Sequence, residues 1–314
     1  MNFCFLGSSD FSIFVLKELI KKFRPNLVIT LPAKAQGRGL LIKPNQVYSF
    51  CLKEKLNVIE LKLWQQIKNL TFDFGLIAGF GKIIPANVLV NQSIFKRGLL
   101  NLHPSLLPLF RGADPIRQTI LNGEKISGAT LIELDQLVDH GPIVAQTRLD
   151  LDQTETLSEL TQTLGRLSGQ LFNQTIELWL TQQPEPKPQD EAKATWTKKV
   201  SKTDGQLNLD ENYDQWQRKI RALNPWPGAF IQIKIRGEEK LLKIYQIEKI
   251  NHLDLKPELK NLTPAKFFQH RNELGLKIAT DFILIKELQI EGKKRMGAKE
   301  FLNGYKIENL SLII

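Results

Sequence analysis

The sequence predicts an α/β protein with a wound, mostly parallel sheet, followed by a smaller domain that is built as a β barrel. In the first half, short apolar runs alternate with segments of helical periodicity, which is typical of parallel strands covered by helices on both faces. A polar, proline-containing stretch then interrupts the chain, and strand-like runs dominate beyond it. The length of 314 residues also favours two domains, because a single hydrophobic core seldom grows beyond about 250–300 residues.

The first half begins with a buried strand at Asn2–Leu6, a turn at Gly7–Asp10 and an amphipathic helix at Phe11–Lys22. The long helix Thr156–Leu180 carries leucines at helical spacing and is expected to close this domain. Between them we expect strands at Leu27–Thr30, Val58–Leu61, Phe74–Ala78, Gly98–Leu102, Leu131–Leu134 and Ile143–Leu149, and helices at Gln46–Glu54 and Trp64–Lys68.

The segment Gln182–Lys193 has three prolines and Ala192 as its one apolar residue, so we expect it to run extended as a linker. The expected boundaries are a first domain over residues 1–181, a linker over 182–205 and a second domain over 206–314. In the second domain we expect strands at Gly228–Ile235, Lys240–Ile250, Gly275–Ile278 and Phe282–Leu288, with a helix at Tyr213–Ala222.

The cysteine content and the N-terminus bear on the compartment. Cys4 and Cys51 are too few for a disulfide framework or a thiolate metal site, which favours a reducing cytoplasm. The N-terminus lacks the basic and apolar regions of a signal peptide, and no apolar run approaches the ~20 residues that a membrane span needs. We therefore expect a cytoplasmic protein that is not inserted in a membrane.

The formal net charge of +10 is unevenly distributed. Residues 1–100 hold 14 Lys/Arg against 5 Asp/Glu, residues 101–200 hold 9 against 13, and residues 201–314 hold 20 against 15. Two basic ends around a mildly acidic middle favour a polyanionic partner such as a nucleic acid. A basic enzyme whose lysines are merely solvated explains the charge alone equally well.

The segment Gly98–Ile116 holds the first candidate site residues. A buried strand is expected to deliver Asn101 and His103 to its C-terminal end, where ligands bind in open α/β sheets. Two residues apart on a strand, their side chains share one face. An imidazole beside a carboxamide offers a proton relay and hydrogen-bond donors to a developing oxyanion, as acyl transfer demands. The alternative is a strand-end histidine that caps a backbone carbonyl.

The segment Gly128–Gln146 holds a second candidate, Asp139, in a turn between two expected strands. Asp139 could orient or protonate His103. By composition Asp135 is an equally reasonable choice, and an aspartate beside glycine is often only turn chemistry. His140 is interpreted as a solvated turn residue.

Several motifs resemble one family. NLHPSLLPLFRGADPI is similar to the N-x-H-x-S-L-L-P-x-x-R-G signature of the 10-formyltetrahydrofolate-dependent formyltransferases, and VDHGPI resembles the aspartate-glycine turn that follows it there. GSSDFS, GFGKIIP, ATWTKKVSKTDGQLN, IRALNPWPGAF and LQIEGKKRM resemble further segments of the family, so the likeness spans essentially the whole chain.

This resemblance implies a Rossmann-like first domain and an OB-like second domain that binds tRNA. It also implies a catalytic trio of Asn101, His103 and Asp139, the formyl donor 10-formyltetrahydrofolate, and no metal. The residues expected at the folate pocket are Ser105, Leu106, Leu107, Pro108, Phe80 and Ile83. The chain departs from the family pattern at Ser8, Ser9, Asp114, His140 and Pro142.

The prediction of which molecule accepts the formyl group rests on the long basic loop Leu31–Asn45. Loops of this length are usually functional, and this one resembles the insertion that tRNA-directed members of the family use, with Arg38 matching the arginine of their G-R-G. Lys34 and Lys43 would contact phosphates. The resemblance thus implies that the protein formylates initiator methionyl-tRNA, and we expect it to be a monomer. The alternatives are a nucleotide-sugar formyltransferase, with the loop merely solvated, and a catalytically silent RNA-binding protein.

The second domain interleaves basic and aromatic residues. Its aromatic residues Trp216, Trp226 and Phe230 are interpreted as core rather than as stacking platforms for bases. The basic residues among them are Arg218, Lys219, Arg221, Lys234, Arg236, Lys240 and Lys243.

Overall fold

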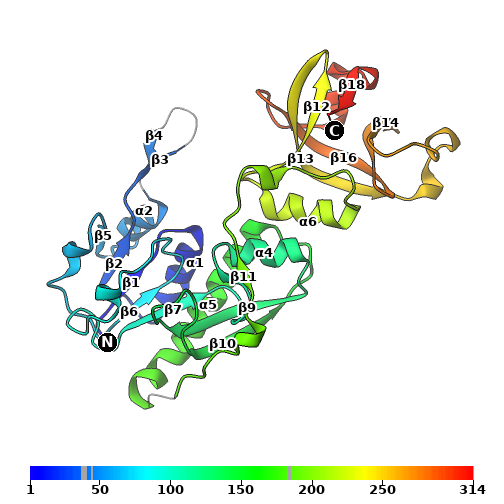
Figure 1. The fold of residues 1–314 in the computed structure, drawn as a ribbon. Coiled ribbons are helices and arrows are strands. Elements are labelled where there is room, and N and C mark those ends of the chain that lie inside the picture. The colour runs from blue at the N-terminus through cyan, green and yellow to red at the C-terminus, as the bar shows by residue number, and fades with distance from the viewer. Residues whose placement is uncertain (37–40, 44, 183–184, 314) are drawn as a thin grey trace. The chain divides into compact units, whose positions relative to one another are not determined.

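A computed structural model describes residues 1–36, 41–43, 45–182 and 185–313. The chain divides into two compact units (Figure 1). The first comprises Met1–Thr119, Glu124–Asp152 and Ser158–Lys198, and the second comprises Ile120–Gly123, Gln153–Leu157 and Lys199–Ile314. The break after Lys198 falls inside the segment that was expected to link two domains.

The first unit is built on a seven-stranded sheet with the strand order β10-β9-β7-β6-β1-β2-β5. The strands β5, β2, β1, β6 and β7 pair in parallel, whereas β9 and β10 are antiparallel to their neighbours. This confirms the prediction of a mostly parallel α/β sheet. The strands are β1 (Phe3–Leu6), β2 (Leu27–Thr30), β5 (Val58–Glu60), β6 (Phe74–Ile77), β7 (Leu99–His103), β9 (Ile126–Glu133) and β10 (Ile143–Asp150).

Two predictions for this unit need correction. The strand expected at Leu131–Leu134 begins earlier, at Ile126, because the small residues from Ser127 to Thr130 are buried although they do not read as an apolar run. The helix expected at Trp64–Lys68 is a short 3-10 turn. The helices of the first unit are α1 (Asp10–Leu19), α2 (Gln46–Lys53), η1 (Trp64–Ile67), α3 (Ala86–Leu89), α4 (Pro115–Asn122), α5 (Leu157–Gln182) and η2 (Glu191–Lys193), and its two remaining short strands are β8 (Arg111–Gly112) and β11 (Trp196–Thr197).

The strands β3 (Lys34–Gln36) and β4 (Leu41–Lys43) correct the expectation of a loop over Leu31–Asn45. They form a separate antiparallel pair in the register Lys34↔Lys43 (Figure 1). Two short runs around a glycine-containing connection are a recognised hairpin signal, so the sequence held the information for this pair. Arg38 lies outside the described residues.

Helices α1 and α5 approach each other closely through two glycines of α5. A Cβ atom added at Gly165 would lie 2.5 Å from Cβ of Phe14, and one at Gly169 would lie 2.7 Å from Cβ of Glu18. The glycines are four residues apart and therefore face the same side of α5. Only residues without a side chain allow the two backbones to come this close.

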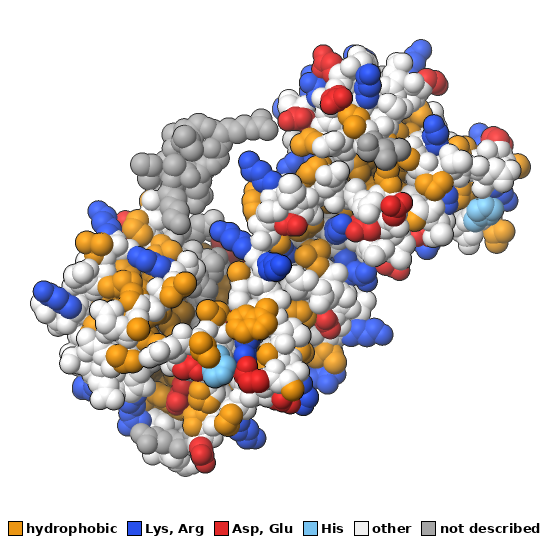
Figure 2. All heavy atoms as spheres, viewed as in Figure 1, with side chains coloured by type: hydrophobic (Ala, Val, Ile, Leu, Met, Phe, Trp, Pro, Cys, Tyr) orange, Lys and Arg blue, Asp and Glu red, His pale blue; other side chains and the backbone are white. Residues whose placement is uncertain are grey.

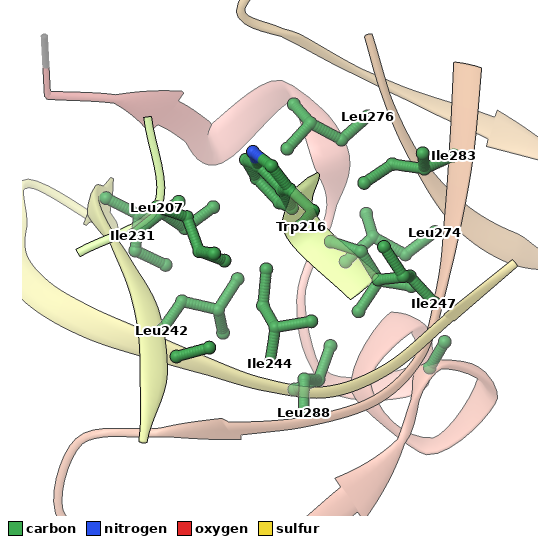
Figure 3. Close-up of a cluster of buried hydrophobic side chains, with 14 of the residues drawn as sticks. Leu207, Trp216, Ile231, Leu242, Ile244, Ile247, Leu274, Leu276, Ile283 and Leu288 are labelled. Carbon is green, nitrogen blue, oxygen red and sulfur yellow. The ribbon is translucent and has the colours of Figure 1, made fainter. Parts of the chain in front are cut away.

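The second unit is a nearly closed antiparallel barrel, as predicted. Its strands follow the order β14-β15-β16-β13-β12-β18, and the end strands β14 and β18 are in contact. Trp216 of α6 is fully buried in the barrel core, among apolar side chains from the surrounding strands (Figure 3). The strands are β12 (Ala229–Ile235), β13 (Glu238–Ile250), β14 (Lys266–His270), β15 (Glu273–Ile278), β16 (Asp281–Ile290), β17 (Met296–Gly297) and β18 (Leu310–Leu312), and the helices are α6 (Tyr213–Leu223), α7 (Ala298–Gly304), η3 (Thr203–Gly205), η4 (His252–Asp254), η5 (Pro257–Leu259) and η6 (Ile307–Asn309).

The aromatic residues of this unit divide between core and surface. Trp216 is core, and its indole N–H donates to the carbonyl of Asn208 over 2.8 Å. Trp226, by contrast, is 48% exposed, and Phe230 is half-buried. The expectation that these aromatics belong to the core is therefore wrong for Trp226.

Two features of the described residues concern binding to nucleic acids and to membranes. On the visible face of each unit, Lys and Arg side chains are spread among acidic and apolar ones (Figure 2). None of the helices in the described part of the chain has both the length and the apolar character needed to cross a bilayer.

The α1–α5 contact generates a stability prediction. At a solvent-exposed position inside a helix, replacing glycine with alanine stabilises the helix by roughly 1 kcal/mol. Gly165→Ala is instead expected to lower the free energy of unfolding by about 1–3 kcal/mol, because the added methyl group overlaps Phe14. Denaturant unfolding measures the change, with Gln162→Ala on an exposed position of α5 as the control. A Gly165→Ala protein as stable as the wild type would contradict the close packing.

Candidate active site

Strand β7 delivers two polar side chains to the carboxyl end of the sheet. It lies between β6 and β9, with Asn101 opposite Ile132 and His103 opposite Thr130. Both side chains are buried, at 9% exposure for Asn101 and 4% for His103. Because polar groups at this depth need partners, the loops above the strand must supply them.

Asp139 reaches the same place from the turn between β9 and β10. Its backbone is in the left-handed region at φ +50°, a conformation that aspartate tolerates better than most residues. The turn also requires Gly141, since a Cβ atom there would lie 1.7 Å from the carbonyl oxygen of Glu133. The departure at Pro142 fits this turn, because its carbonyl accepts from the amide of Glu133.

The three predicted residues meet at the carboxylate of Asp139. Its Oδ1 accepts from Nδ2 of Asn101 over 3.1 Å, and its Oδ2 accepts from the amide of Gly112 over 2.9 Å. The same Oδ2 lies 3.6 Å from Nδ1 of His103. The structure thus brings Asn101, His103 and Asp139 together, although they are separated by up to 38 positions in the sequence.

The ring of His103 is held from two sides. Its Nε2 lies 2.9 Å from the carbonyl oxygen of Phe110, which can only accept, so Nε2 carries a proton. The strand-end histidine thus does cap a backbone carbonyl, as the alternative interpretation of the sequence predicts. The other ring nitrogen, Nδ1, faces the carboxylate of Asp139.

The loop after β7 is fixed from beneath by Thr130 of β9. The Thr130 hydroxyl donates to the carbonyl of Ser105 and accepts from the amide of Leu107. Gln146 donates to the carbonyl of Leu107 and to the Thr130 hydroxyl. The Ser105 hydroxyl donates to the carbonyl of Leu109 over 2.6 Å, so it braces the loop itself.

The other residues expected at a folate pocket differ in exposure. Leu107 is buried, and Leu106 and Pro108 are half-buried in the loop above His103. Phe80 is buried and packs edge-on against Trp64. Ile83 is 83% exposed.

Asp135 and Asp139 have different hydrogen-bond partners in the structure, and only Asp139 contacts Asn101. Asp135 accepts from the amide of Leu137 and pairs with Nδ1 of His140 over 2.5 Å, so its carboxylate is used within the turn. His140 also lies 3.5 Å from Glu191, and its side chain is 35% exposed. The expectation of a solvated His140 is therefore only partly right. Within the described ranges, no cluster of three or more His, Cys, Asp or Glu side chains is placed to hold a metal ion.

Three polar residues beside the site were not singled out from the sequence. Arg111 is 1% exposed, and its guanidinium donates to Gln189 and to both oxygens of Glu191. The hydrogen bond to Glu191 raises the pKa of Arg111 and lowers that of Glu191. An arginine in a proline-rich sequence context gives no sign of such burial, and Gln189 and Glu191 lay in the expected linker. No sequence signal pairs these three residues.

Two departures at the N-terminal turn have structural roles. Ser9 caps α1 in a capping box with Ser12, and the Ser8 hydroxyl accepts from the amide of Leu31 at the end of β2. Among the residues expected to contact tRNA, Lys34 and Lys43 are backbone partners in the β3–β4 register, and Arg38 is not among the described residues.

A carboxamide, an imidazole and a carboxylate in contact at the carboxyl end of β7 suit the transfer of an acyl-type group, and comparison with known families identifies such a class. Residues 1–176 match the formyl transferase family model, and residues 199–306 match the model of the formyl transferase C-terminal domain. The chain therefore belongs to the formyl transferase family, which confirms the resemblance found in the sequence.

Two curated relatives that match over nearly their full length have the same name. Methionyl-tRNA formyltransferase of Caldicellulosiruptor saccharolyticus is 34% identical over 98% of both chains, and that of Rickettsia bellii is 30% identical over 98% of this chain and 97% of the relative. Among solved structures, methionyl-tRNA formyltransferase from Clostridium thermocellum matches with a TM-score of 0.51 at 19% identity, covering 79% of this chain and 93% of that one. The N-formyltransferase from Helicobacter canadensis, solved with folinic acid and dTDP-3-aminofucose, has a TM-score of 0.62 at 19% identity over 91% and 98% of the chains.

The Arg111–Glu191 pair generates a prediction on stability against pH. The pKa of Glu191 is lower in the folded protein than its unfolded value of about 4.3, so ionised Glu191 stabilises the fold above that pH. The stabilisation is lost as the pH falls through the folded pKa. Glu191→Gln is therefore expected to lower Tm slightly at pH 7, and the difference from wild type should vanish once the pH has fallen below the folded pKa of Glu191.

The control for Glu191→Gln is Asp190→Asn, which removes an exposed carboxylate that pairs with Lys193 in the same segment. Such exposed pairs contribute little, so Tm should hardly change. A Tm difference for Glu191→Gln that persists at low pH would show that the effect is not due to the ion pair.

Proposed function

We propose that this protein transfers a formyl group from 10-formyltetrahydrofolate to the α-amino group of methionine on initiator methionyl-tRNA. Membership of the formyl transferase family supports the reaction class, and the names of full-length relatives at up to 34% identity support the acceptor. The observation that carries the proposal is the contact of Asn101, His103 and Asp139 at the carboxyl end of β7.

In this reaction the neutral amine of the methionyl group attacks the formyl carbon. The bond from that carbon to N10 of the folate breaks, the amine loses one proton, and N10 gains one. The barrier is lowered by donors aimed at the formyl oxygen, where negative charge develops. Asn101 is suited to this role, because Asp139 takes one of its two N–H groups and thereby fixes the direction of the amide.

His103 and Asp139 are the groups suited to move the proton. The Phe110 carbonyl holds Nε2 of His103, so the exchangeable proton belongs to Nδ1 and the adjacent carboxylate. We therefore assign His103 to proton transfer together with Asp139 rather than to direct binding of the oxyanion through Nε2. One of the pair, directly or through water, passes the proton to the departing N10.

The folate is proposed to lie against the loop above His103. Leu106, Leu107 and Pro108 offer apolar surface there, and Ser105 keeps the loop in shape through its bond to Leu109. Phe80 and Ile83 complete the proposed border. We propose that the reaction uses no metal, with the free N–H of Asn101 serving the charge that develops on the formyl oxygen.

The acceptor is proposed to be recognised by the hairpin segment Leu31–Asn45 and by the second unit. Arg38, Lys34 and Lys43 are the residues proposed to contact the tRNA, and the net charge of +10 favours a polyanionic substrate. The chain is proposed to act as a monomer in the cytoplasm.

The role of Asn101 gives a prediction on rate. Asn101→Ala is expected to lower kcat about 10²- to 10³-fold, because it removes one oxyanion donor. Formyl transfer to methionyl-tRNA at saturating substrates measures it. Asn87→Ala, an exposed asparagine of α3, is the control and should retain wild-type turnover. Near wild-type kcat for Asn101→Ala would remove Asn101 from the mechanism.

The acceptor is tested by offering the wild-type protein methionyl-tRNA and, separately, a nucleotide 4-amino sugar, each with 10-formyltetrahydrofolate. We expect turnover on the tRNA alone, abolished in Asp139→Asn. Arg38→Ala should weaken the use of methionyl-tRNA while folate binding stays unchanged, since Arg38 is assigned to tRNA. Turnover only on the sugar nucleotide would preserve the chemistry and replace the acceptor.

A further inference from the structure

The segment after α5, residues 187–197, clamps both loops that carry the site. At its start Lys187 exchanges two backbone hydrogen bonds with Ile143, directly after the Asp139 turn. At its end β11 pairs in parallel with β8, and the Thr195 hydroxyl accepts from the amide of Phe110. The Phe110 carbonyl in turn holds His103.

Gln189 lies in the middle of this segment and connects the two loops through one side chain. Its Nε2 donates to the carbonyls of Asp139 and Gly141, over 2.9 and 2.8 Å. Its Oε1 accepts from Nε and Nη2 of Arg111, over 3.1 and 2.8 Å. All donors and acceptors of the amide are used, and exchanging its O and N atoms would set donor against donor and acceptor against acceptor.

The other end of this connection is also fixed. The Arg111 guanidinium is buried and is bound by both oxygens of Glu191. The residue after Arg111 is Gly112, whose amide donates to Oδ2 of Asp139. Gln189 therefore connects the backbone of Asp139 to Arg111 of β8. The next residue of β8, Gly112, binds the Asp139 side chain.

We infer that Gln189 is a positioning residue that sets the Asp139 carboxylate against Asn101 and His103. Asp139 adopts a left-handed backbone that few side chains favour, and the two bonds from Gln189 brace the turn on both sides of His140. A displacement of about 1 Å in a reacting constellation costs up to 10²-fold in rate. The catalytic part of this inference rests on the proposed function, whereas the positioning itself does not.

The test is Gln189→Glu, which keeps the shape of the side chain and its acceptor for Arg111 but removes both donors to the turn. We expect the single-turnover rate of formyl transfer to fall about 10- to 100-fold. KM for methionyl-tRNA and for the folate should stay within about twofold, since Gln189 is not assigned to either substrate. Gln65→Glu, on an exposed position of η1, is the matched control and should leave the rate unchanged.

A spectroscopic readout separates positioning from a general loss of structure. In protein labelled with 15N-histidine, the Nδ1 signal of His103, assigned with His103→Gln, should shift in Gln189→Glu because the facing carboxylate moves. The His252 signal, from the second unit, should not shift. This measurement needs no acceptor, so it decides the inference even if the wild-type protein does not formylate methionyl-tRNA.

Each outcome is decisive. A shifted His103 signal together with a slower single turnover supports positioning of Asp139 by Gln189. An unchanged His103 signal overturns it, whether the rate is unchanged or has fallen through a loss of folded protein. A shifted signal with an unchanged rate overturns the catalytic part and leaves Gln189 as a brace of the turn. Inactive wild-type protein with a shifted signal instead removes the proposed function and keeps the positioning.

Discussion

Two buried polar side chains at the end of strand β7 need hydrogen-bond partners, and the loops of the first unit are arranged to supply them. Asn101 and His103 sit on β7 with less than a tenth of their surface exposed, so each must be hydrogen-bonded within the protein. The carboxylate of Asp139 and the carbonyl of Phe110 meet this need. Both partners lie on loops, and these loops must fold over the strand end for the buried groups to be satisfied.

The same constraint explains why a proline-containing segment far along the chain belongs to the first unit. Loops that carry partners for buried groups need support of their own, and Arg111, Gln189 and Glu191 provide it through charged and neutral hydrogen bonds. The first unit therefore reaches to Lys198 rather than ending with α5. All of the proposed chemistry lies within this unit, and the barrel adds a separate surface built on the core around Trp216 (Figure 3).

Much of the fold was predictable, because local patterns decide it. The alternation of apolar runs with helical segments predicted the parallel strands and α5, and the switch to strand-like runs predicted the barrel. The failures came where packing overrides pattern. Burial of Ser127–Thr130 extends β9 beyond the expected strand. The strand β14 and the helix α7 were missed, since their short segments carry little periodicity of their own.

The sequence by itself determined the family, the class of fold and the candidates Asn101, His103 and Asp139, because motif spacing and strand alternation are local properties. By composition alone it left Asp135 and Asp139 equally placed, the resemblance to the family favoured Asp139, and nothing in the sequence pointed to Gln189. Tertiary structure decided both, by directing Asp135 to His140 and Asp139 to Asn101, and by bringing Gln189 back beside the turn. Hydrogen bonds between residues 50 positions apart depend on the folded path of the chain, and no local pattern encodes that path.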